Sequence, residues 1–254
     1  MLNETQVRHY HELGYVIPDF RFPESVLEDL RADHARLVAR HPELRQYCPN
    51  LLSYDLRFLE IARTPEIVAM VGQILGPDFA LWNSSLFAKP AADGKRTPWH
   101  QDGQYWPIRP LATCTVWIAL DDSTTENGCL RVIPGSHHGQ RLRAHRKVDT
   151  DDVTLNQELL ESEYDLSQAA DLVLKAGQMS LHDVYLLHGS EPNHSPQPPL
   201  AGWEASLTPM MRCPNAVSQS INRRCANSGS ETPPTKLLPS LKKQIASHIA
   251  RSPL

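Results

Sequence analysis

The first third of the chain carries apolar residues at helical spacing, which predicts amphipathic helices. Asn3 followed three positions later by Gln6 is a capping signal, and Gly14 marks the place where this first helix should stop. A second helix is expected from Pro23 to about Arg40.

The third predicted helix has the clearest boundaries. Thr64 is a natural N-cap, Pro65 fits the first helical turn, and Gly76 suits the end. The apolar stripes of the three helices are Val7, Tyr10 and Leu13; Val26, Leu27, Leu30, Leu37 and Val38; and Ile67, Val68, Val71, Ile74 and Leu75.

After Gly76 the pattern changes to short apolar segments rich in branched and aromatic residues, separated by Gly, Pro, Asn and Asp. These segments predict β-strands at 78–88, 113–120, 129–133, 171–174, 179–187 and 203–211. Asn127-Gly128 lies between the predicted strands 113–120 and 129–133, and both residue types can adopt the positive φ of a tight turn. The expected fold class is therefore mostly β, with helices at the N-terminal side.

Residues 137–170 are polar, with a basic half followed by an acidic half. So long a connection within a compact domain is usually a solvated insertion, a binding loop or a lid. Two interpretations remain open: a surface insertion, or a lid that excludes water and whose basic half meets an anionic substrate.

Composition and charge restrict the class of protein. Of 254 residues, 41% are hydrophobic and 21% are charged, which is typical of a soluble globular chain. The net charge of −4 lacks the basic excess that nucleic-acid binding requires. The sequence has neither a membrane-helix run nor a signal-like N-terminus, so we expect a cytoplasmic protein without a membrane partner. The five cysteines form no Cys-x-x-Cys pair, which predicts reduced thiols.

The most informative chemistry lies in Thr97-Pro98-Trp99-His100-Gln101-Asp102-Gly103. Alternate side chains of a strand share a face, so His100 and Asp102 are expected to reach one metal ion while Gln101 points away. A third ligand is expected from His188, which follows an apolar segment 86 residues after Asp102. His182 is an alternative ligand, or a buried histidine behind the site.

Two histidines and one carboxylate on one face of a metal suit non-haem Fe(II) chemistry, because open positions remain for a bidentate 2-oxo acid and dioxygen. Zinc is the chemical rival, since zinc hydrolases also keep an open position. Zinc hydrolysis would need a nearby carboxylate base, and the sequence has no HExxH motif.

The chain resembles the phytanoyl-CoA dioxygenase family of Fe(II)/2-oxoglutarate-dependent oxygenases, from the N-terminal helix to about Asn193. The motifs that carry the resemblance are Pro98-Trp99-His100-Gln101-Asp102, Trp117-Ile118-Ala119-Leu120-Asp121-Asp122 with Glu126-Asn127-Gly128-Cys129-Leu130, Ile133-Pro134-Gly135-Ser136-His137, and Leu187-His188-Gly189-Ser190-Glu191-Pro192-Asn193.

The resemblance implies a double-stranded β-helix, or jelly roll, that spans residues 1–212, with iron held by His100, Asp102 and His188. It also implies that Trp117 and Ser190 bind 2-oxoglutarate. A core aromatic at 117 and a turn hydroxyl at 190 are the alternative interpretations. Gln104, Tyr105, Trp106 and Arg109 follow the His-x-Asp pair directly, so we expect them to contribute to a substrate pocket or to its rim.

The sequence departs from the family at one position. The family arginine for the far carboxylate of 2-oxoglutarate typically lies eleven residues after the distal histidine, and here that position is Pro199. Another cation, such as Lys89, Arg109 or Arg131, could replace it. Alternatively, the protein binds the co-substrate weakly, uses another oxo acid or has lost catalysis.

Wholesale divergence of the C-terminal part is a further explanation. Residues 213–254 are predicted to form a divergent tail, poorly ordered at about 213–239 because that stretch is rich in Ser, Asn and Pro.

The function expected from the resemblance is a dioxygenase that uses Fe(II), 2-oxoglutarate and O₂ to hydroxylate or oxidise a small organic substrate. Two rivals stay open at this point: a catalytically impaired jelly-roll binding protein, favoured by Pro199, and a zinc hydrolase.

Overall fold

The structure of the chain is a computed structural model that describes residues 1–91, 93–196 and 200–209. The predicted tail at 213–254, and with it the domain boundary after residue 212, lies outside the described residues. No helix in the described part is long and apolar enough to cross a membrane.

Helices form where the sequence predicts them. Helix α1 (Glu4–Leu13) begins with the expected capping box, in which Asn3 and Gln6 bond each other's backbone N–H, and ends at Gly14 with φ 84°. Helices α2 (Glu24–Arg40) and α4 (Pro65–Leu75) also match their predicted ranges, and a short α3 (Phe58–Ala62) was not predicted. Thr64 precedes α4 as expected, but its side chain makes no capping hydrogen bond. Short 3₁₀ turns lie at Pro42–Leu44, Leu51–Ser53, Asp102–Gln104, Glu161–Glu163 and Leu166–Gln168.

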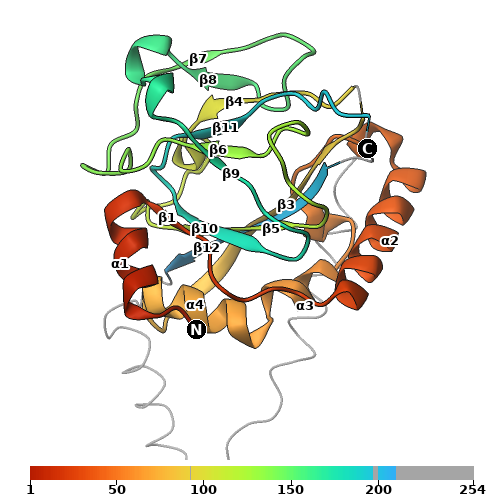
Figure 1. Cartoon of the computed structure of the whole chain (residues 1–254), viewed down its shortest axis with the longest axis horizontal. Coiled ribbons are helices and arrows are strands. Elements are labelled where there is room, and N and C mark those ends of the chain that lie inside the picture. Colours follow the sequence, from red (N-terminus) through yellow and green to blue (C-terminus); the bar gives the residue numbers. More distant parts are fainter. Residues whose placement is uncertain (92, 197–199, 210–254) are drawn as a thin grey trace, which may run out of the picture. The chain divides into compact units, whose positions relative to one another are not determined.

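Two antiparallel sheets make up the jelly roll (Figure 1). The larger has the strand order β1 (Tyr15–Val16), β10 (Met179–Asp183), β5 (Cys114–Ala119), β12 (Leu200–Pro209), β3 (Phe79–Lys89) and β2 (Tyr47–Cys48). The smaller has the order β4 (Thr97–His100), β11 (His188–Ser190), β6 (Leu130–Val132) and β9 (Ala170–Leu172). The mostly-β fold class predicted from the sequence is confirmed.

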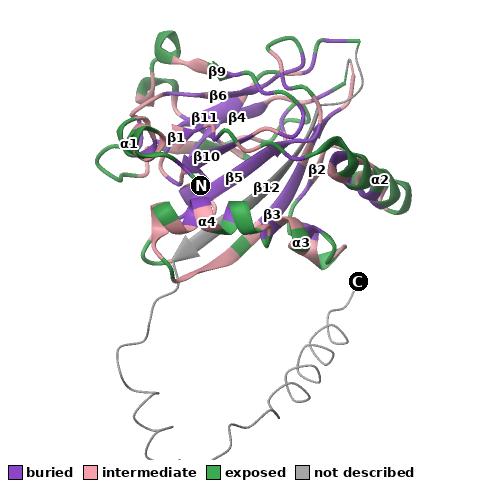
Figure 2. Cartoon of the chain, turned by 60° about the horizontal axis from the view of Figure 1, so that its bottom comes forward, coloured by how far each residue is buried: buried purple, intermediate pink, exposed green. Residues whose placement is uncertain are grey.

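The main hydrophobic core lies between the helices and the larger sheet (Figure 2). Helix α4 contacts β5, and its buried side chains are Ile67, Met70 and Val71. Val68 was predicted on this buried stripe but is 40% exposed, because the helix turns it toward solvent. The helical layer closes one face of the large sheet and leaves its other face for the site.

Asn127-Gly128 makes a tight turn, with Gly128 at φ 81°, but it does not join a hairpin. Its flanking strands lie in different sheets, because β5 pairs with β10 and β12 while β6 pairs with β11 and β9. The predicted strand 179–187 is likewise divided, since β10 ends at Asp183 in one sheet and β11 begins at His188 in the other.

The polar stretch 137–170 is an ordered insertion built around a separate hairpin, β7 (His145–Lys147) and β8 (Gln157–Leu159), which lies above β4 in Figure 1. Glu158 is buried and bonds both Arg96 and Arg146. The side chain of Arg141 lies 3.6 Å from that of Glu163. Arg141 and Arg146 of the basic half therefore pair with Glu163 and Glu158 of the acidic half, and the lid interpretation stays a prediction.

Candidate metal centre

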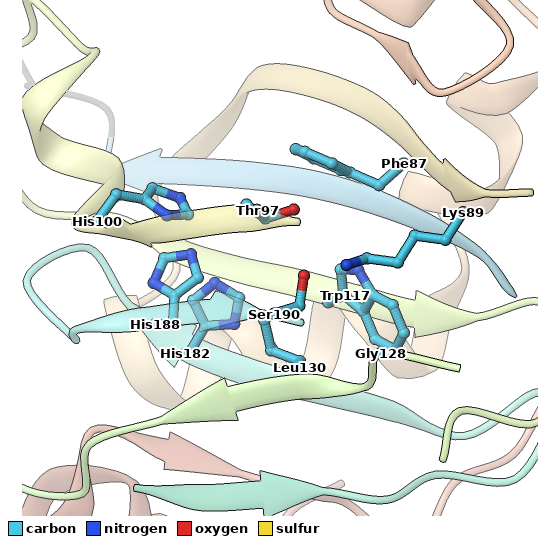
Figure 3. Close-up of a pocket in the computed structure, with 10 residues that line it drawn as sticks. All are labelled: Phe87, Lys89, Thr97, His100, Trp117, Gly128, Leu130, His182, His188 and Ser190. Atoms are coloured by element: carbon cyan, nitrogen blue, oxygen red, sulfur yellow. The ribbon is translucent and has the colours of Figure 1, made fainter. Parts of the chain in front are cut away.

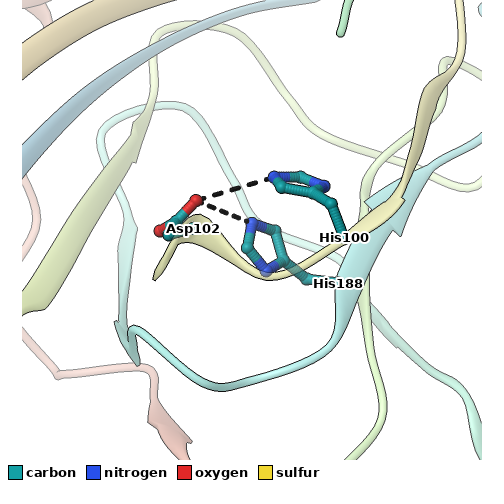
Figure 4. Close-up of side chains that lie close together, drawn as sticks. All are labelled: His100, Asp102 and His188. Carbon is teal, nitrogen blue, oxygen red and sulfur yellow. Dashed lines mark ion pairs between the residues drawn. The ribbon is translucent and has the colours of Figure 1, made fainter. Parts of the chain in front are cut away.

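His100, Asp102 and His188 come together at one end of the smaller sheet (Figure 4). His100 ends β4, His188 begins β11, and the antiparallel register places the two residues opposite each other. Asp102 opens the 3₁₀ turn that follows β4. The Nε2 atoms of His100 and His188 lie 3.6 and 3.4 Å from Asp102 Oδ1.

Hydrogen bonds orient both imidazole rings. His100 Nδ1 lies 2.8 Å from the carbonyl oxygen of Pro98, and His188 Nδ1 lies 3.0 Å from that of Leu186. A carbonyl oxygen only accepts, so each Nδ1 carries the hydrogen and each Nε2 lone pair faces Asp102. This orientation is the one that metal-binding histidines adopt.

Thr115 orients the carboxylate from behind. Its hydroxyl donates a 2.8 Å hydrogen bond to Asp102 Oδ2, which leaves Oδ1 directed toward the two histidines. The three donor atoms lie within 4.8 Å of one another, and all three residues are buried. These atoms therefore fit a single metal ion.

The electrostatics also suit a cation. Burial, with a smaller contribution from the neighbouring His188, lowers the pKa of His100 to about 4, although Asp102 acts to raise it. Burial alone would raise the pKa of Asp102, but His188, His100 and His182 outweigh it and hold the pKa well below the usual value. At neutral pH His100 is therefore a neutral donor and Asp102 an anion, which is the protonation state that metal binding requires.

A narrow pocket opens on one side of this group (Figure 3). It measures about 40 Å³ and contains both predicted co-substrate residues, Trp117 from β5 and Ser190 from β11. Lys89 reaches it from the end of β3. The full lining is Phe87, Lys89, Thr97, His100, Trp117, Gly128, Leu130, His182, His188 and Ser190.

A wider pocket of about 420 Å³ opens beside it and shares His100 and Phe87 with the narrow one. Tyr105 and Trp106, both predicted for the substrate side, line this wider pocket together with Asp102. The remaining lining residues are Tyr47, Pro49, Asn50, Trp82, Asn83, Ser85 and Leu155, the last contributed by the 137–170 insertion.

Two predicted substrate residues lie elsewhere. Gln104 lines neither pocket and instead donates to the side chain of Gln157, which ties the turn after β4 to the insertion. Arg109 is exposed and bonds the carbonyl of its neighbour Ile108. Neither side chain lines either of the two pockets, and the contribution of each residue to the substrate pocket or its rim stays a prediction.

His182 lies behind the group. Its Nε2 is 3.5 Å from Asp102 Oδ2, the oxygen turned away from the other histidines, and neither ring nitrogen has a hydrogen-bond partner. The structure therefore places it as a buried neighbour of the carboxylate, and the group of three that could share an ion does not include it.

Sequence reasoning missed Thr115, Ser85 and Phe87. The signal that could have found them is strand alternation. Thr115 lies two residues before Trp117, and the odd-numbered residues of β3 from Asn83 to Lys89 line the two pockets in turn.

The sequence matches the phytanoyl-CoA dioxygenase family over residues 10–199. The chain belongs to this family. A probable alpha-ketoglutarate-dependent hypophosphite dioxygenase of Stutzerimonas stutzeri is 33% identical over 137 residues, and human peroxisomal phytanoyl-CoA dioxygenase is 32% identical over 145. These alignments cover 53% and 55% of this chain but only 47% and 42% of the two relatives, so the match spans less than half of either.

Solved structures of oxygenases share the fold. The apo form of the non-heme monooxygenase ThoJ superposes with a TM-score of 0.69 at 25% identity, over 80% of this chain and 77% of the other. EvdO2 from Micromonospora carbonacea var. aurantiaca, complexed with 2-oxoglutarate, gives a TM-score of 0.68 at 22% identity, over 84% and 94%. The double-stranded β-helix implied by the family resemblance is thereby confirmed.

Proposed function

We propose that this protein is an Fe(II)- and 2-oxoglutarate-dependent dioxygenase that oxidises a small organic substrate. The observation that carries the proposal is the convergence of two histidine Nε2 atoms and one carboxylate oxygen. A hydrogen bond at the other polar atom of each side chain, Nδ1 in the histidines and Oδ2 in Asp102, fixes its orientation. Membership of the family supports the same conclusion.

In this proposal His100, Asp102 and His188 hold the iron. When bound there, Fe(II) supplies open coordination positions for a 2-oxo acid and for dioxygen. Pro98, Leu186 and Thr115 keep the three donors aligned, and burial of all three ligands keeps water from competing for them.

The linings of the two pockets suggest their occupants. The narrow pocket contains Trp117 and Ser190, the two residues expected to bind the oxo acid, whereas the pocket of about 420 Å³ has the size that suits the molecule that is oxidised. The pockets meet at His100, so both ligands would reach the metal from neighbouring directions.

The wider pocket supports an uncharged or weakly polar organic substrate. Its described lining combines aromatic rings with the side-chain amides of Asn50 and Asn83, and includes no lysine or arginine. Apart from the metal centre, a free oxyanion would find no cationic side chain among these described residues. We therefore expect a molecule that presents an apolar or ring face to Trp82, Tyr105 and Trp106.

The zinc hydrolase has no support from the geometry. Such an enzyme needs a carboxylate base near the metal, and among the described residues that line either pocket the one carboxylate is Asp102, which faces the two histidines.

The test is conversion of 2-oxoglutarate to succinate and CO₂ under Fe(II) and O₂, measured by mass spectrometry with ¹⁸O₂. One oxygen atom should enter succinate, and the other should enter the hydroxylated substrate. Turnover by the Fe(II) protein but not by the zinc-loaded protein is expected. The proposal would be contradicted if 2-oxoglutarate gave no succinate and no other oxo acid of a panel were consumed. Activity of the zinc-loaded protein in the absence of O₂ would also contradict it.

A further inference from the structure

Lys89 places an ammonium group in the wall of the narrow pocket. The residue ends β3, is 5% exposed, and extends its side chain toward the Trp117 ring and the Ser190 hydroxyl (Figure 3). Its Nζ donates to the backbone carbonyl of Glu191. An ammonium has three N–H donors, so this bond leaves two of them for a ligand.

Lys89 forms no ion pair with a carboxylate of the described residues within 4.0 Å. The carboxylate of Glu191 instead lies 2.9 Å from Arg131, which also pairs with Asp171. Burial lowers the pKa of Lys89 to about 7, although Glu191 and Cys129 act to raise it. A buried ammonium without a paired anion is costly, and an anionic ligand in the pocket would relieve that cost.

The other cations considered from the sequence do not reach this pocket. Arg131 is held by Asp171 and Glu191 and lies over the Trp99 ring, and Arg109 is exposed and bonded to Ile108. Lys89 is the one lysine or arginine among the described residues that line the pocket.

The backbone around Lys89 is closely packed. Gly128 approaches the Glu191 carbonyl so closely that a Cβ at position 128 would collide with its oxygen, and Asn193 donates to the Lys89 carbonyl at 2.8 Å. Across the sheet Lys89 pairs with Leu200, the residue after Pro199. Lys89 is thus the last residue of β3 and pairs with the first residue of β12.

We propose that the Lys89 ammonium binds the far carboxylate of the co-substrate, and that Lys89 thereby restricts the co-substrate to 2-oxo acids with a second carboxylate. The 2-oxo acid end lies at His100 and His188, and the far carboxylate lies between Lys89 and Ser190. This inference rests on the proposed function, because it assumes that an oxo acid occupies the narrow pocket.

The test compares two co-substrates of equal chain length. 2-Oxoglutarate and 2-oxopentanoate share a five-carbon chain, but only the first has the far carboxylate. Each is titrated calorimetrically into anaerobic Fe(II) protein as wild type, Lys89→Met and Lys89→Arg. Lys175→Met is the matched control, since Lys175 is an exposed lysine paired with Asp122 outside both pockets.

Lys89→Met should weaken 2-oxoglutarate by about 10- to 100-fold, the range for loss of a charge-assisted bond, and change 2-oxopentanoate less than about twofold. Lys89→Arg should retain most of the preference for the dicarboxylate, and Lys175→Met should match wild type. Circular dichroism and iron content establish that each variant is folded and loaded.

Equal weakening of both acids in Lys89→Met would assign Lys89 a structural role and overturn the inference, as would unchanged 2-oxoglutarate binding. Failure of the wild type to bind either acid would overturn the proposed function itself. The two failures are therefore distinguishable.

Discussion

His100 and His188 face each other across the antiparallel pair of β4 and β11, and each ring is held by the carbonyl two residues before it. The symmetry follows from the register: two extended strands place the two imidazoles opposite each other, with ring centroids 4.1 Å apart. Asp102 then needs only the turn after β4 to bring its Oδ1 within 3.6 Å of both Nε2 atoms.

The Thr115 hydroxyl predicts a measurable effect on metal affinity. Thr115→Val removes the bond to Asp102 Oδ2 with little change in volume, and we expect Fe(II) affinity to fall by about 10- to 100-fold. Thr113→Val is the matched control, because Thr113 is equally buried but its hydroxyl has no hydrogen-bond partner. Competition with a coloured chelator measures both, and equal affinities in the two variants would contradict the role of Thr115.

The buried histidines His182 and His188 should differ in their effect on iron binding. His188→Ala should lose iron binding and activity together, whereas His182→Asn should keep one iron per chain, because His182 faces the oxygen of Asp102 directed away from the group. Iron content after desalting measures this. Retained iron in His188→Ala, with loss in His182→Asn, would show that the distal ligand is misassigned.

Co-substrate affinity should depend on pH through Lys89. Its pKa is lowered to about 7 by burial, so the ammonium is lost as pH rises and 2-oxoglutarate should bind several-fold more weakly at pH 8.5 than at pH 6. Glu191 and Cys129 act to raise the pKa of Lys89, and His100, His182 and His188 line the same pocket. Burial raises the pKa of the Cys129 thiol to about 11, so that thiol stays neutral in this range. Calorimetry of Lys89→Arg should show a flat profile, since arginine stays charged. A matching slope in that variant would point to another group.

The insertion depends on one buried carboxylate. Glu158→Gln removes the charge that pairs with Arg96 and Arg146, and we expect a loss of about 1–3 kcal/mol in the free energy of unfolding. Urea denaturation measures the change, with Glu161→Gln as control because Glu161 is exposed. A loss of equal size in the control would remove the special role of Glu158.

Local features were the most predictable from the sequence. The capping box of α1 depends on Asn3 and Gln6, which are three residues apart, so the sequence contains the whole interaction. The metal candidates were predictable for a related reason: strand alternation relates His100 to Asp102, and the family motif identifies His188.

Features that depend on which strands become neighbours were not predictable. The sheet change between β5 and β6 and the contact of Thr115 with Asp102 arise from strand order across two sheets. The same strand order decides that Lys89, rather than Arg109 or Arg131, lines the narrow pocket. Arg109 shows that nearness in the sequence does not by itself place a side chain, because it follows Asp102 closely but does not line the wider pocket.

Calorimetric titration of 2-oxoglutarate into the anaerobic protein, with and without Fe(II), tests the central claim most directly. We expect saturable binding of one molecule per iron-loaded chain, and at least about tenfold weaker binding to the metal-free protein and to Asp102→Ala. Equal affinity with and without Fe(II), or unchanged binding in Asp102→Ala, would show that these three side chains do not form the metal centre on which the co-substrate depends.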